Sequence, residues 1–82
     1  MAHSHHLIKI IADMAIFLEF TDEHSLNPDA AVEMMEHIAA ELQLLTDDEK
    51  GCVIDSFAEI AKAYQGDESG FVKALPDTLG LR

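Results

Sequence analysis

Residues 27–49 read NPDAAVEMMEHIAAELQLLTDDE, and they carry the clearest folding signals in the chain. Asn27 is a preferred N-cap residue, because its side-chain oxygen accepts a hydrogen bond from a backbone N–H that the helix leaves unpaired. Pro28 suits the first helical position, where its φ is already helical and its missing N–H costs nothing. A helix is therefore predicted to begin at Pro28. The residues at helical spacing that form its apolar side are Ala31, Val32, Met35, Ile38, Ala39, Leu42 and Leu45.

A second helix start follows almost directly in the sequence. Residues 46–49, TDDE, fit a capping box. In this motif the Thr46 side chain accepts a hydrogen bond from the backbone N–H of Glu49, and the Glu49 side chain accepts one from that of Thr46. A further helix is predicted from Asp47 to about Gln65. Because the connection between the two helices is very short, they must form an antiparallel or steeply crossed hairpin.

Before residue 27, a first helix is predicted from Ser4 or His5 to Thr21, and it is apolar on nearly all sides. Its expected core-facing side chains are Leu7, Ile10, Ile11, Met14, Phe17 and Leu18. The apolar residues left over are Ile8, Ile16 and Phe20. A helix of this kind is usually buried on more than one side. The second cover would be the C-terminal tail, another protein or a second copy of the chain, and a symmetric homodimer is the expected one.

The C-terminal part is predicted to be less regular. Gly66 is expected to end the third helix as its C′ residue, and residues 66–70 form a polar break. Residues 71–75 should make one or two helical turns that stop at Pro76, which cannot donate a backbone hydrogen bond. The predicted fold class is therefore all-α, a small three-helix bundle with a short fourth helical segment and an apolar C-terminal tail.

The length of 82 residues suits one domain, which we assign to residues 7–82. Residues 1–6 are predicted to be a flexible N-terminal segment, and its histidines are also typical of a cloning tag. The start of the chain lacks the Lys/Arg-rich region of a signal peptide, and its apolar run is interrupted by charges. The expected location is the cytoplasm.

Charge narrows the choice of partner. Sixteen acidic residues against five basic ones give a formal net charge of −11. This balance disfavours nucleic acids and anionic membrane surfaces, both of which attract clustered Lys and Arg. It suits solubility or a basic protein partner.

The sequence offers little for catalysis or metal binding. Cys52 is the one cysteine, and the acidic residues 47–49 beside it oppose formation of a thiolate. Glu33 and His37 share a helix face, but the paired Glu-x-x-His motif of di-iron bundles is absent. No cofactor and no metal site are expected, and the chain is predicted not to be an enzyme.

A protein-binding role is the leading hypothesis. In size, acidity and helical content the chain resembles the helical immunity proteins of bacterial toxins. This resemblance implies a toxin-neutralising, antitoxin-like protein that engages a basic partner. The alternatives are a self-associating helical adaptor or regulatory protein, and a carrier of a small apolar ligand. The residues predicted to contact a partner are Ile8, Ile16, Phe20, Glu33, Glu36, His37, Asp48, Asp55 and Glu59.

Overall fold

The computed structural model describes residues 2–82, and the side chains of residues 5–82. This part of the chain is helical and contains no strand, which confirms the predicted all-α class. Its elements are α1 (Ala2–Phe20), α2 (Pro28–Gln43), α3 (Asp47–Ile60), the short 3₁₀ helix η1 (Ala61–Ala63) and α4 (Gly66–Thr78).

Both predicted helix starts are confirmed. The Asn27 side chain accepts hydrogen bonds from the backbone N–H groups of Asp29 (2.8 Å) and Ala30 (3.3 Å). At the start of α3, the Glu49 N–H donates to the Thr46 hydroxyl (3.1 Å), and the Thr46 N–H donates to the Glu49 carboxylate (2.8 Å). These caps satisfy backbone groups that a helix leaves unpaired, so local sequence sets where α2 and α3 begin.

The first helix begins earlier than predicted. Its backbone is helical from Ala2, so Ser4 lies within α1 and is not its N-cap. Met1 lies outside the described residues, and so do the side chains of His3 and Ser4. The prediction that residues 1–6 are flexible stays a prediction.

The side of α1 that faces the core was predicted wrongly. The buried residues of α1 are Ile8, Ala12 and Ala15, whereas the large side chains Leu7, Ile10, Met14 and Phe17 are exposed. Alanines at 12 and 15 have no atoms beyond Cβ, which lets α1 lie close against α3 and α4, both of which it contacts. Of the residues predicted to face the core, Ile11 does pack against it, as do Ile8 and Ile16 on the same side of α1. A helix that is apolar nearly all round gives no periodicity by which to choose between its faces.

The largest fully buried side chains come from the C-terminal half of the chain. They are Phe57, Val72, Leu75, Pro76 and Leu79. The fourth helix is longer than predicted, because it begins at Gly66 and continues past Pro76 to Thr78. Pro76 falls in the last turn, where the loss of one backbone hydrogen bond is tolerated, and its ring is buried in the core. Gly66, with φ of +61°, starts α4 and does not end α3.

The apolar C-terminal tail packs against the bundle. Gly80 has φ of +72°, and its N–H donates to the carbonyl of Asp77, while the N–H of Leu81 donates to that of Pro76. This is a Schellman motif, which turns the chain back and places an apolar residue against the helix. Leu81 is accordingly buried. The Gln43 side-chain amide also donates to the carbonyls of Leu79 (2.8 Å) and Gly80 (2.7 Å), which ties the end of α2 to the tail.

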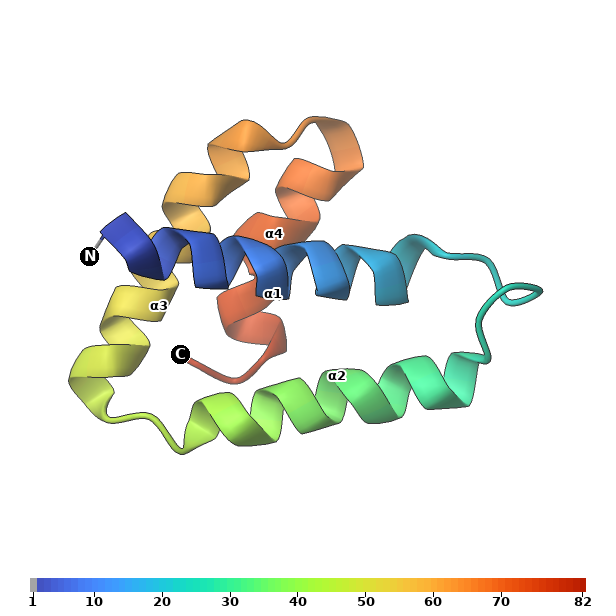
Figure 1. Cartoon of the computed structure of the whole chain (residues 1–82), viewed down its shortest axis with the longest axis horizontal. Coiled ribbons are helices and arrows are strands. Elements are labelled where there is room, and N and C mark those ends of the chain that lie inside the picture. The colour runs from blue at the N-terminus through green and yellow to red at the C-terminus, as the bar shows by residue number, and fades with distance from the viewer. Residues whose placement is uncertain (1) are drawn as a thin grey trace.

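Helix α2 lies at the edge of the bundle. Figure 1 shows it antiparallel to α1, with the α1–α2 loop projecting beyond α3 and α4. Within the described residues, α1 contacts α2, α3 and α4, whereas α2 has only α1 as an extensive helix neighbour. The radius of gyration, 12.5 Å, is slightly above the value of about 12 Å expected for a compact chain of this length. The arrangement leaves much of α2 in water.

Candidate binding site

The described surface has a groove of about 660 Å³ where α1, α2 and α3 meet. We call it the α1–α3 groove. Its lining residues are His5, Leu7, Ile8, Ile11, Leu42, Leu45, Asp48, Glu49, Cys52, Val53, Asp55 and Ser56. Because these come from three helices, the groove exists only once the bundle has formed.

The floor of the α1–α3 groove is apolar. Ile8 of α1, Leu42 of α2 and Val53 of α3 are buried members of the main core. Ile11 and Leu45 are half-buried and pack against the same core. The side chains of the floor are therefore held by the same packing that stabilises the fold.

The α3 edge of the groove is acidic. Asp48, Cys52 and Asp55 are exposed and follow i, i+4, i+7 spacing, which places them along one face of α3. Glu49 adds a third carboxylate, although one of its oxygens caps the helix. No lysine or arginine is among the lining residues. The groove thus combines an apolar floor with a negative rim.

Two of the predicted partner-binding residues, Asp48 and Asp55, are brought together at this rim. Ile8 lies in the floor and is only 6% exposed, so it is not a free surface residue, and its contact with a partner stays a prediction. Ile16 is half-buried against the core and is likewise not a free surface residue. Phe20 is 48% exposed and packs edge-to-face on Phe71, with ring centroids 5.5 Å apart. The three residues therefore do not form the surplus apolar face that the sequence suggested.

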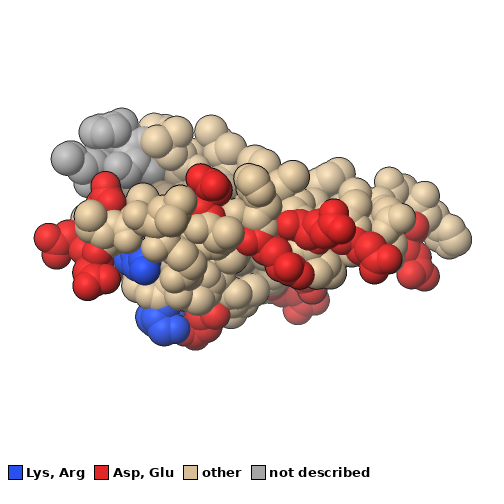
Figure 2. All heavy atoms as spheres, turned by 90° about the horizontal axis from the view of Figure 1, so that it is seen from below, with Lys and Arg blue, Asp and Glu red and all other residues tan. Residues whose placement is uncertain are grey.

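The remaining predicted residues lie outside the groove. Glu33, Glu36 and His37 are exposed on α2, a helix with four acidic residues and no lysine or arginine. Figure 2 shows Asp and Glu side chains gathered along the face on the α2 side of the molecule. Glu59 of α3 forms an ion pair with Lys62 at 3.3 Å, so part of its charge is balanced within the chain. The acidic side chains of α2 thus form a second negative surface.

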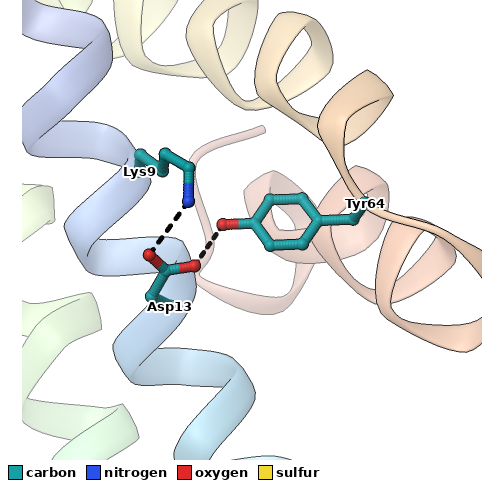
Figure 3. A network of polar contacts seen from close by, with 3 residues as sticks. All are labelled: Lys9, Asp13 and Tyr64. Carbon is teal, nitrogen blue, oxygen red and sulfur yellow. Dashed lines mark hydrogen bonds and ion pairs between the residues drawn. The ribbon is translucent and has the colours of Figure 1, made fainter.

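A polar network that the sequence did not reveal joins α1 to the residue that follows η1 (Figure 3). The Tyr64 hydroxyl donates a hydrogen bond to Asp13, which also pairs with Lys9 at 3.2 Å. The lysine ammonium lies 5.2 Å from the centre of the Tyr64 ring, within reach of a cation–π interaction. The i, i+4 spacing of Lys9 and Asp13 is a usable sequence signal, but Tyr64 is 51 residues away from Asp13.

The same network shifts three pKa values. The hydrogen bond from Tyr64, together with Lys9, lowers the pKa of Asp13. Partial burial, followed by the hydrogen bond to Asp13, raises the pKa of Tyr64. The hydrogen bond to Asp13 also raises the pKa of Lys9. The network therefore ties the end of η1 to α1.

Among the residues whose side chains are described, no three His, Cys, Asp or Glu side chains gather into a group that could hold a metal ion. No described helix is long and apolar enough to cross a membrane. Comparison with protein-family models, curated proteins and solved structures finds no match to the chain.

Proposed function

We propose that this chain is a non-catalytic acidic binding protein that engages a basic protein partner in the cytoplasm. Its most concrete form is the neutralisation of a toxin or nuclease, in the manner of an immunity protein or antitoxin. The observation that supports this proposal is the α1–α3 groove, whose apolar floor is edged by Asp48, Glu49 and Asp55 and whose lining residues include no lysine or arginine.

Such a groove suits an amphipathic segment of a basic protein. Apolar side chains at helical spacing would fill the floor formed by Ile8, Ile11 and Val53. Lysine or arginine residues on the same segment would then face Asp48 and Asp55. Complementary charge of this kind speeds association and rejects acidic competitors. The exposed carboxylates of α2 extend the negative field beyond the groove and add to the attraction at longer range.

The second candidate function is a carrier of a small apolar ligand, which the volume of the groove favours. A volume of about 660 Å³ falls within the range of roughly 300–1,000 Å³ typical of ligand sites. The acidic rim disfavours ligands with a carboxylate head, such as fatty acids. A carrier role therefore requires a neutral or cationic ligand. A basic protein segment with apolar side chains suits both the apolar floor and the acidic rim more fully.

The test compares three forms of the chain as baits for native lysate. The groove variant is Asp48→Lys with Asp55→Lys. The control variant, Glu23→Lys with Glu68→Lys, changes the net charge equally at exposed positions that do not line the groove. We expect the parent and the control to retain a basic protein that the groove variant loses. Circular dichroism must show all three baits folded.

The captured protein is then produced alone and together with the chain. Growth arrest by that protein, relieved by the parent chain and not by the groove variant, would support the neutralising role. Equal loss of capture by the groove variant and the control would show that net charge alone, and not the groove, attracts the partner. That outcome would overturn the proposal.

A further inference from the structure

The outer side of α1 carries four large apolar side chains that the fold leaves uncovered. Leu7, Ile10, Met14 and Phe17 are 61%, 54%, 46% and 57% exposed. Their 3-4-3 spacing places them in one line along the helix, as do the a and d positions of paired helices. We call this line the outer stripe. The outer stripe contains none of Ile8, Ile16 and Phe20, the residues that the sequence predicted to be surplus.

The C-terminal tail does not cover the outer stripe. Leu79 and Leu81 are buried in the main core, and Gln43 holds the backbone carbonyls of Leu79 and Gly80. The tail is thus fixed elsewhere. A line of exposed apolar side chains that its own chain leaves open is typical of a surface that meets another molecule.

We propose that the outer stripe is the contact face of a symmetric dimer of this chain. Charge supports a second copy as the occupant. Helix α1 carries one lysine and two carboxylates, Lys9, Asp13 and Glu19, so it holds only −1 of the net charge of −11. Two copies therefore repel each other least where their α1 helices face one another. A strongly basic partner would find no carboxylate within the stripe, whereas the α1–α3 groove offers three.

The order of the residues also suits pairing with itself. In an antiparallel pair with the two-fold axis near Ala12, Leu7 lies opposite Phe17 of the other copy, and Ile10 lies opposite Met14. Each contact is then made twice, as a two-fold interface requires. The stripe spans about 15 Å of helix. A single helix pair of this length falls at the low end of the interface range, below about 1,200 Å² in total, so the dimer should be weak and reversible.

Sedimentation velocity across a range of chain concentrations tests the proposal. The stripe variant is Ile10→Glu with Met14→Glu, neither of which lines the α1–α3 groove. The control variant, Ala40→Glu with Ala74→Glu, adds the same charge at exposed positions on α2 and α4. We expect the parent and the control to shift from monomer towards dimer as concentration rises, and the folded stripe variant to remain a monomer. A parent that is monomeric throughout, or a stripe variant that still dimerises, would overturn the proposal.

Disulfide trapping tests the antiparallel register. Cys52 is exposed, so Cys52→Ser provides a cysteine-free background. In that background, a mixture of Ile10→Cys chains and Met14→Cys chains should give the mixed disulfide in excess over either chain paired with itself. Preferential 10–10 and 14–14 pairs would indicate parallel helices and would overturn the proposed geometry. This result is separate from the groove experiment, because Ile10 and Met14 do not line the groove, and the Cys52→Ser change in the groove is common to all the chains compared.

Discussion

The α3–α4 side and the α1–α2 side of the molecule use apolar residues in opposite ways. On the α3–α4 side, Phe57, Leu75 and Leu79 are removed from water almost completely. On the α1–α2 side, large apolar residues such as Phe17 and Leu44 stay largely exposed. Burial of a large side chain stabilises the fold by roughly 1.5–3 kcal/mol relative to exposure. The difference indicates that the α3–α4 side supplies more of the stability, while the α1–α2 side leaves large apolar side chains in water.

The largest expected effect tests this division at the core. Leu75→Ala should lower the free energy of unfolding by about 2–5 kcal/mol, because it leaves a cavity in a fully buried site. Leu44→Ala, at a residue that is 79% exposed, should change it by less than about 0.5 kcal/mol. Urea unfolding followed by circular dichroism measures both. Similar costs for the two variants would contradict the division.

The next effect concerns the link between the two sides. Gln43→Ala removes two hydrogen bonds to the C-terminal tail and should cost about 1–2 kcal/mol. Faster hydrogen exchange at the amides of Gly80 and Leu81 should accompany the loss. Gln65→Ala is the matched control, since Gln65 is exposed and its side chain does not cap α4. Unchanged exchange in Gln43→Ala would show that the Schellman motif holds the tail without α2.

Removal of the helix caps should have a smaller effect on the free energy of unfolding, and the effect should differ between α2 and α3. Thr46→Ala breaks the capping box of α3 and should cost about 0.5–2 kcal/mol. Asn27→Ala removes the cap of α2 and should cost less in global unfolding, because α2 is less well packed and can fray by itself. Urea melts give the two free energies. If Asn27→Ala costs more than Thr46→Ala, α2 must unfold together with α3 in one cooperative transition.

The smallest effect is expected from the network between α1 and Tyr64. Because folding lowers the pKa of Asp13, its contribution to stability is present above the unfolded pKa and is lost as pH falls through the lower folded value. Asp13→Asn should therefore weaken the acid dependence of stability slightly. The effect stays small because the Asp13 side chain is about half exposed. Thermal melts between neutral pH and pH 3 compare the variant with the parent. If Tm falls equally with pH in both, the result would count against the network.

Folding signals that lie close together in the sequence were predictable. Asn27 and Thr46 placed the starts of α2 and α3, because each cap needs residues only two or three positions away. Gly66 and Pro76 led to errors, because residues that usually break helices were accommodated at the two ends of α4. Local propensity carries no information about that tertiary packing.

The candidate site could be predicted only in part. Asp48 and Asp55 were identified as exposed acidic residues, but the groove they edge depends on how three helices meet. The outward side of α1 was not predictable, because the choice rests on the fit of Ala12 and Ala15 against α3 and α4. The size of the side chains at the helix crossing decided which face of α1 is buried. A hydrophobic pattern carries no information about that size.

The position of α1 also has a consequence for biosynthesis. Its buried face packs on α3 and α4, and the core includes Leu79 and Leu81 near the C-terminal end. During translation, α1 leaves the ribosome before α3 and α4, against which its buried face packs. Until α3 and α4 have emerged, the nascent chain exposes apolar residues on both faces of α1. Ribosome-associated chaperones bind exposed apolar segments of this kind. Native packing of α1 must therefore wait until α3, α4 and the tail have been synthesised.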